Sequence, residues 1–336
     1  MRSRKLSTGI AILAISFFLL QGLAGAAAKY TIKVGHNQME KTVFHQSALK
    51  FKALVEQRTK GDIQIQVYPA QQLGNDMERL QAQQMGTLEC SIATLPRISS
   101  AIGAVQIYDL PFLFPSYDVL FKVTDGKLGA ELNKLLLQKL GIVGVTFWHT
   151  GFKQFTANTP IHKPEDLKGL KIRTMENPLI IAQYRALGAN PVPIDFHELY
   201  TSLQQKVVDG EENDINTIHD MKFYEVQKYM SVSNHAWIGQ AFSFSKAFWD
   251  KLPKNYQDIL AQTARETGKE ERAGVIAAEK DMTKKFQDSG MNVIYLNAQE
   301  LDAFAKKMRP VHDQFADKIG KDLVNLAYKE VQAATK

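Results

Sequence analysis

Hydrophobic residues in the first third of the chain recur with two different periods. Over residues 30–34 and 63–67 they occupy every second position, which is typical of strands. Over residues 44–55 they recur every three or four positions, which places them on one face of a helix. A second helix is predicted over residues 77–86 and a third strand over residues 89–94. Strands that alternate with amphipathic helices predict a parallel sheet covered by helices.

A second α/β pattern begins near residue 151. Strands are predicted over residues 152–157, 170–174 and 192–194, and helices over residues 178–187 and 198–207. No fixed-period repeat, low-complexity tract or Pro/Ser-rich linker separates this pattern from the first. We therefore expect two lobes joined by segments that cross between them.

The remainder of the chain, beyond Trp249, is mostly helical. One extended helix is predicted over residues 256–287, and one strand over residues 293–296. The predicted fold class is α/β with two lobes, each a mixed or parallel sheet flanked by helices.

The first 28 residues have the layout of a secretory signal peptide. Three basic residues lie within the first five positions and are followed by an apolar run over residues 10–20, in which Ser16 is the one polar residue. Ala26 and Ala28 form a small-residue cleavage pattern just before Lys29. An uncleaved membrane anchor is the alternative, but the apolar run is short for a bilayer.

Composition excludes several classes of protein. The 336 residues are 45% hydrophobic and 23% charged, which is ordinary for a globular protein and unlike a disordered chain. A single cysteine excludes an intramolecular disulfide framework. The formal net charge of +6 falls to +3 without the leader, whose only charged residues are Arg2, Arg4 and Lys5. The remaining basic residues are scattered among acidic ones, so nothing indicates a nucleic-acid partner.

The usual catalytic and metal-binding patterns are missing from the sequence. It contains no G-x-S-x-G, G-x-x-x-x-G-K-[ST], G-x-G-x-x-G or H-E-x-x-H motif, and its eight histidines lie far apart. The acidic run over residues 209–214 lacks the glycine and glutamate positions of an EF-hand loop. Cys90 lies in an apolar strand, which favours a buried inert thiol. We therefore expect no metal, no cofactor and no enzymatic activity.

Four stretches between residues 168 and 213 carry a family resemblance. They read KGLKIRTMENPL (168–179), ALGA with PVP (186–193), FHELY (196–200) and QQKVVDGEEN (204–213). The chain resembles the solute receptors of tripartite ATP-independent periplasmic (TRAP) transporters, the DctP-type family. Shorter matches over most of the chain after the leader support this, at residues 73–74, 86–89, 109–112, 222–229 and 252–253.

The resemblance implies a periplasmic-binding-protein fold and a set of ligand contacts. Arg173 stands where the family has its main carboxylate clamp, and a guanidinium fork suits that role because it can bind both carboxylate oxygens. Asn213 matches an asparagine that hydrogen-bonds the ligand. Phe196 matches an aromatic residue that packs against the ligand, and Trp148, near the crossing into the second lobe, offers another wall. Core packing is an equally good interpretation of the two aromatic residues.

The sequence departs from the family at positions that bear on the ligand. Many members have a second arginine where this chain has Lys153, which is a cation without the bidentate fork. Glu176 replaces an asparagine of some members and lies close enough to Arg173 to hold its side chain or accept a ligand hydroxyl. Thr94 and Arg97 of the first lobe are expected to meet the far end of the ligand. Lysine at position 153 favours a hydroxylated acid or a monocarboxylate over a plain dicarboxylate.

The resemblance thus predicts a monomeric periplasmic receptor. This receptor captures a small organic carboxylate and delivers it to TRAP permease subunits in the membrane. The ligand classes are dicarboxylates, sugar acids such as uronates, and 2-hydroxy or 2-oxo acids. A binding protein of an ATP-driven importer and a secreted hydroxy-acid lyase or isomerase remain alternatives; the long helix over residues 256–287 favours the TRAP type. The expected organisation is a signal peptide (1–28), a first lobe (29–150 with 239–278), a second lobe (151–238 with 279–310) and a C-terminal helical segment (311–336).

Overall fold

The computed structural model describes residues 28–336. The predicted signal peptide therefore lies outside the described residues, except for its last residue. None of the helices in this described part combines the length and apolar character needed to cross a membrane.

The first lobe begins with the predicted β-α-β-α-β unit. Strand β1 lies between β2 and β3 and is parallel to both, as the alternating pattern predicted. Helix α2 begins with a capping box in which the Asn75 side chain accepts from the backbone and Glu78 bonds back to the Asn75 amide. The elements are β1 (Tyr30–Gly35), α1 (Val43–Arg58), β2 (Ile63–Tyr68), α2 (Asp76–Gln84) and β3 (Cys90–Thr94).

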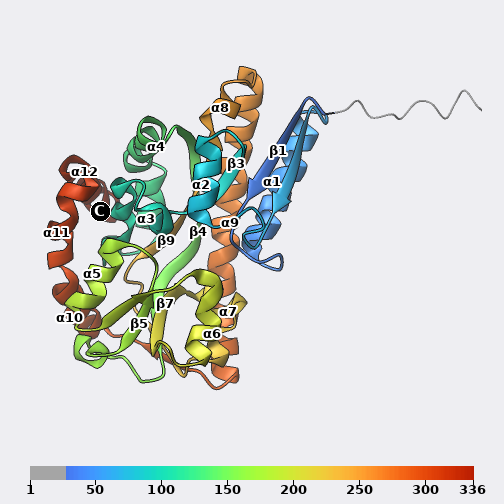
Figure 1. Ribbon diagram of the computed structural model, residues 1–336. Helices are drawn as coiled ribbons and strands as arrows, with labels where there is room; N and C mark the ends of the chain where they lie inside the picture. Colours follow the sequence, from blue (N-terminus) through green and yellow to red (C-terminus); the bar gives the residue numbers. More distant parts are fainter. Residues whose placement is uncertain (1–27) are drawn as a thin grey trace, which may run out of the picture.

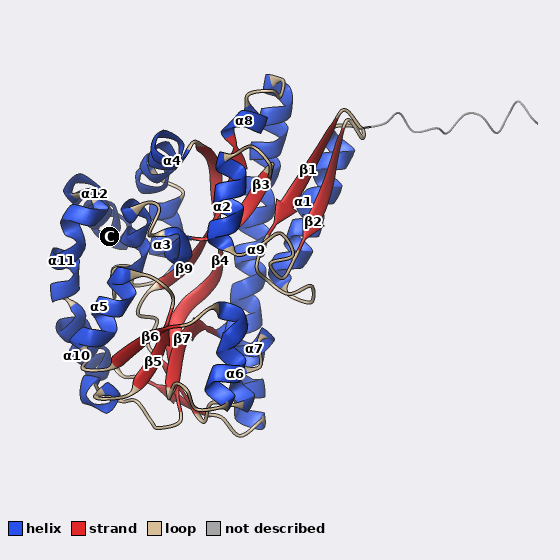
Figure 2. Ribbon diagram, in the orientation of Figure 1, coloured by secondary structure: helices blue, strands red, loops and turns tan. Residues whose placement is uncertain are grey.

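Two 3-10 segments and two α-helices lead from this unit to the crossing strand. They are η1 (Leu95–Ile98), η2 (Gly103–Asp109), α3 (Tyr117–Thr124) and α4 (Lys127–Leu140). The crossing strand is β4 (Ile142–Ala157), which Figure 2 shows running from the upper sheet into the lower one. The sequence predicted only residues 152–157 of it as a strand. Its first half pairs antiparallel with β9 (Trp237–Ser245), a buried strand that the sequence analysis did not predict.

Strand β4 changes partners near a bulge between His149 and Gly151. Up to Phe152 it pairs with β9, and from Lys153 it pairs with β7. Gly151 has a φ of 146°, and a Cβ there would lie 2.7 Å from the Asp214 Cβ. Only glycine fits this close approach, so it allows one strand to serve both sheets.

The second lobe continues on β4. Its sheet has the order β10-β8-β4-β7-β5-β6, with β5 parallel to β6 and β7. The elements are β5 (Lys171–Thr174), α5 (Pro178–Ala186), β6 (Asn190–Pro193), α6 (Leu199–Gln204), β7 (Gly210–Asp214), α7 (Ile215–Asp220), β8 (Tyr229–Val232) and β10 (Asn292–Tyr295). The acidic run at 209–214, which lacks the pattern of an EF-hand loop, largely forms the buried strand β7.

One long helix joins the lobes on the outside. After the short helix α8 (Lys246–Trp249), helix α9 (Lys254–Asp288) has 35 residues and contacts α1 of the first lobe and α7 of the second. Figure 1 shows it along one side of the molecule, opposite the C-terminal helices. Those helices are α10 (Ala298–Met308), α11 (Pro310–Ile319) and α12 (Lys321–Thr335). The predicted two-lobed α/β fold, with crossing strands and a long helix, is confirmed.

Helix α9 is seated on the first lobe by a close contact with Trp148. The indole is fully buried against Phe44 and Phe242, and its Nε1 donates to the Ala264 carbonyl at 3.1 Å. Gly268 lies one turn further along α9, and a Cβ there would be 2.6 Å from that Nε1. The helix can therefore approach the sheet this closely only because residue 268 has no side chain.

We expect Gly268→Ala to lower the free energy of unfolding by up to about 2 kcal/mol. Alanine favours a helix by about 1 kcal/mol over glycine, but overpacking in a core costs about 1–3 kcal/mol and dominates here. Urea denaturation of wild type, both single variants and the double variant with Trp148→Phe measures the coupling. A cost for Gly268→Ala that is equal in both backgrounds would contradict the proposed contact.

Candidate functional site

The site begins with Arg173 on β5, which is fully buried. Its Nε donates to the Ile194 carbonyl at 2.9 Å, which fixes the plane of the guanidinium. No described residue accepts a hydrogen bond from its two terminal nitrogens, although both are buried. Burial, and then the nearby charge of Arg97, lower the pKa of Arg173 to about 10, so it remains a cation at neutral pH.

Asn213 lies on the same face of the second-lobe sheet as Arg173. Arg173 pairs in register with Glu211 on β7, and Asn213 follows two residues later. Asn213 Nδ2 donates to Glu211 Oε2 at 2.6 Å, while the Thr156 hydroxyl donates to the other Glu211 oxygen at 2.8 Å. Burial raises the pKa of Glu211 to about 7. The structure thus brings together Arg173 and Asn213, two of the residues that the sequence predicted.

Lys153 occupies a different environment from Arg173. It is in register with Asp214, so strand alternation places its side chain on the opposite face of the sheet, with Glu212. Its Nζ lies 2.9 Å from Glu212 and 3.2 Å from Asp109, and all three side chains are fully buried. Although burial disfavours the ammonium, Glu212 and Asp109 hold the pKa of Lys153 above its usual value. The charge of Lys153 is therefore neutralised within the protein.

The carboxylates around Lys153 have further partners. Glu212 Oε2 lies 2.9 Å from His235 Nε2 and accepts from the Tyr184 hydroxyl at 3.1 Å. Asp109 accepts from Asn177 Nδ2 at 2.9 Å. Because Asp109 belongs to the first lobe and the other residues to the second, this buried network joins the lobes.

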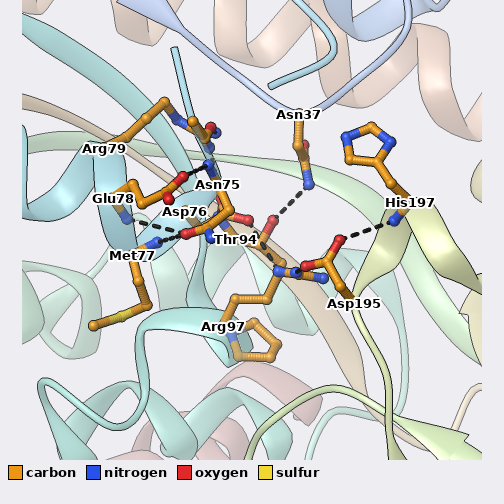
Figure 3. Close-up of polar contacts among 12 residues, drawn as sticks. Asn37, Asn75, Asp76, Met77, Glu78, Arg79, Thr94, Arg97, Asp195 and His197 are labelled. Carbon is orange, nitrogen blue, oxygen red and sulfur yellow. Dashed lines mark hydrogen bonds and ion pairs between the residues drawn. The ribbon is translucent and has the colours of Figure 1, made fainter. Parts of the chain in front are cut away.

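Arg97 carries the second contact between the lobes. Its Nε lies 3.1 Å from Asp76 Oδ2, and its Nη2 forms an ion pair with Asp195, just before Phe196 in the second lobe. The second Asp195 oxygen accepts from the His197 amide at 3.0 Å, as Figure 3 shows. The sequence predicted Arg97 as a ligand contact but did not identify its acidic partners.

A cavity of about 390 Å³ lies beside this ion pair. Both lobes line it, with Arg97 from the first and Glu176, Ile194 and Asp195 from the second. Glu176 is exposed and forms no ion pair within residues 28–336. Ile194 lines the cavity, and its carbonyl accepts the hydrogen bond from Arg173 Nε. The buried guanidinium therefore lies just behind the wall of this cavity.

The other predicted residues are placed as follows. The Thr94 hydroxyl accepts from Asn37 Nδ2 at 3.0 Å and donates to Gln240 at 3.1 Å, near Arg97 (Figure 3). Phe196 is buried among apolar residues of the second lobe such as Leu199. Trp148 lies inside the first-lobe core, so the structure does not bring it to Arg173, and core packing accounts for it.

Several residues of the site carried no signal in the sequence analysis. Asp76 was not singled out as a site residue, Glu212 belonged only to an acidic run, and Asp109 only to a family match. Asp195 lies between two matched stretches, directly before Phe196, and this position was the signal that could have indicated it. Among residues 28–336, no group of three metal-ligating side chains lies close enough to hold an ion.

Comparison with known proteins accounts for this arrangement. The profile of the family "Bacterial extracellular solute-binding protein, family 7" (DctP) matches residues 34–318. The chain belongs to this family. It is 35% identical to the C4-dicarboxylate-binding periplasmic protein DctP of Rhodobacter capsulatus over 339 residues, covering 97% of each chain.

Solved structures agree with this assignment of the solute-binding protein. A TRAP periplasmic solute-binding protein from Shewanella oneidensis, with bound succinate, matches with a TM-score of 0.86 and 35% identity, covering 93% of this chain and 100% of that one. The sugar-acid-binding protein DctPAm from Advenella mimigardefordensis, in complex with galactonate, matches with a TM-score of 0.87 and 29% identity, covering 92% and 99%. The predicted family is confirmed.

We expect Lys153→Met to lower the free energy of unfolding by about 3–5 kcal/mol, because it leaves two buried carboxylates without their cation. Lys254→Met is the matched control. Its ion pair with Asp258 is exposed and is worth at most about 1 kcal/mol. Urea denaturation of the ligand-free proteins measures both changes. Equal losses in the two variants would contradict a structural role for Lys153.

Glu211 gives the solute-binding protein a pH-dependent stability. Its pKa rises from 4.5 to about 7 on folding, so the native state keeps a proton that the unfolded chain releases in this range. The free energy of unfolding should therefore fall as pH rises from 4.5 to 7, by up to about 1.4 kcal/mol per pH unit from this residue. Denaturation of ligand-free Glu211→Gln across this range should show a flatter profile. The control Glu165→Gln, at an exposed position, should keep the wild-type slope; the same slope in both variants would refute the assignment to Glu211.

Proposed function

We propose that this protein is the extracytoplasmic receptor of a TRAP transporter and captures a small organic acid anion. Family membership and the solved TRAP relatives support this function. The observation that carries it is the buried Arg173 guanidinium, whose two terminal nitrogens have no partner among the described residues. A buried donor left unpaired is costly, so a carboxylate that binds both nitrogens satisfies a need that the protein itself does not meet.

Asn213 completes the proposed clamp. Its Nδ2 donates to Glu211, and this hydrogen bond fixes the orientation of the amide. The side-chain carbonyl of Asn213 is then available to accept a hydrogen bond from a ligand hydroxyl. The exclusion of water around the fully buried Arg173 strengthens its attraction for an anion. Affinity in this proposal comes from a preformed cation and an oriented amide.

Capture is proposed to proceed by closure of the two lobes. The Arg97 ion pair with Asp195 spans the cleft, and the ligand would lie between elements of both lobes. A ligand that contacts both lobes binds the closed form better than the open one, and this difference shifts the population toward closure. The closed receptor would then present a surface that membrane permease subunits recognise.

The location and assembly of the receptor follow from the same proposal. Removal of residues 1–28 would release a monomer of 308 residues into the periplasm. An ATP-driven importer would use a receptor of similar outline, but the 35-residue helix α9, which contacts both lobes, favours the TRAP type. We propose that the protein binds its acid without turnover, which incubation with candidate acids and product analysis tests.

We expect Arg173→Ala to abolish the rise in melting temperature that a cognate acid causes, and Arg173→Lys to lose most of it because the fork is gone. The ligand is first identified by native mass spectrometry of the protein as purified, then removed by denaturation and refolding. Thermal unfolding with and without added ligand is the measurement. Arg185→Ala, an exposed arginine on α5, is the control and should respond as wild type. A normal response in Arg173→Ala would rule out the clamp.

A further inference from the structure

The charges around the cleft bear on which class of acid the protein binds. Relatives include proteins with a bound dicarboxylate and with a bound sugar acid, so family membership alone does not decide. A dicarboxylate brings two negative charges and needs two cations, because an unpaired charge in a buried site is costly. The number of cations without carboxylate partners is therefore the informative quantity.

Arg97 is already neutralised. Asp76, which is 1% exposed, lies 3.1 Å from its Nε, and Asp195 binds its Nη2 from across the cleft. Asp76 also binds Arg79 at 2.6 Å, so it is held in place from a second side. A ligand carboxylate that approached Arg97 would have to displace Asp195 or lie beside it.

Lys153 is neutralised as well, since Glu212 and Asp109 both lie within 3.2 Å of its Nζ. Arg173 is the remaining cation at the cleft, and no carboxylate in residues 28–336 forms an ion pair with it. The site therefore offers one cation to a ligand, and that cation can take one carboxylate.

The rest of the cavity offers acceptors. Glu176 and Asp195 both line the space of about 390 Å³ beside Arg97. Carboxylates accept hydrogen bonds but donate none, so a ligand satisfies them with donors, and in an organic acid without nitrogen those donors are hydroxyls. A second ligand carboxylate in the same space would face the charge of Glu176, which is unpaired within residues 28–336. Asp195 already occupies Arg97, the one cation among the described residues that line this space.

We propose that Asp195 determines specificity by neutralising Arg97, so that the receptor selects polyhydroxylated acids with a single carboxylate. The inference rests on the proposed function, with Arg173 as the carboxylate clamp. In the bound state the carboxylate lies on Arg173, and the hydroxyl groups donate to Asp195 and Glu176.

The first experiment compares two ligand classes on the refolded, ligand-free chain lacking residues 1–28. Isothermal titration calorimetry is done with aldonic and uronic acids of four to six carbons, and with α,ω-dicarboxylic acids of the same lengths. The affinity for at least one hydroxylated monocarboxylate should exceed that for any dicarboxylate by about 100-fold or more. In a dicarboxylate complex the uncompensated charge and the unsatisfied acceptors should each lower the affinity by about tenfold or more.

The second experiment changes the selecting residue. Asp195→Ala removes a hydrogen-bond acceptor and frees Arg97. The affinity for the best hydroxylated acid should therefore fall about 10- to 100-fold, and the affinity for succinate or a longer dicarboxylate should rise about tenfold or more. The double variant Asp195→Ala/Arg97→Met should lose that gain, because the freed cation is gone. Asp281→Ala, an exposed position on α9, is the matched control and should bind as wild type.

The outcomes separate the two proposals. A ratio between the two affinities that Asp195→Ala leaves unchanged overturns the specificity role, and this includes an equal loss of affinity for both ligand classes. A wild-type protein that prefers a dicarboxylate, with that binding lost in Arg173→Ala, overturns the inference but leaves the proposed function standing. If no acid of either class binds, both proposals fail.

Discussion

Pairing of buried charge is the constraint on which the rest of this structure depends. Lys153 lies fully buried between Asp109 of the first lobe and Glu212 of the second, and each carboxylate has further hydrogen-bond partners. Such a cluster is tolerated only when every member is satisfied, so it fixes how β4, β7 and the end of η2 meet. The junction between the lobes is thereby positioned, and with it the cleft.

The same constraint distinguishes the cations of the site. Arg97 and Lys153 have carboxylate partners, whereas the terminal nitrogens of Arg173 have no hydrogen-bond partner in the described part of the chain, residues 28–336. The unsatisfied guanidinium is thus the natural place for an anionic ligand. Because Arg97 and Asp195 come from different lobes, closure of the cleft and the charge presented to the ligand are coupled.

Part of this site was predictable from the sequence. Arg173, Glu176 and Asn213 were identified from their positions in matched stretches, and Arg97 was expected to reach the ligand from the first lobe. In the structure Arg97 and Glu176 line the cavity, whereas Arg173 is buried. The role of Lys153 was not predictable, because it depends on Asp109, which lies 44 residues away in the chain. Strands β7 and β9 were missed since both are buried on two faces and lack the alternation that marks a half-exposed strand.

The sequence by itself determined the periodicity of the first lobe, the long helix and the family, because these are properties of local pattern and of matched stretches. Only the tertiary structure decided which charged residues neutralise one another. Strand alternation directs Lys153 and Arg173 to opposite faces of one sheet, and folding brings Asp195 against Arg97. Ion pairing depends on distances of a few ångströms between residues far apart in the chain, and those distances exist only after the lobes have packed.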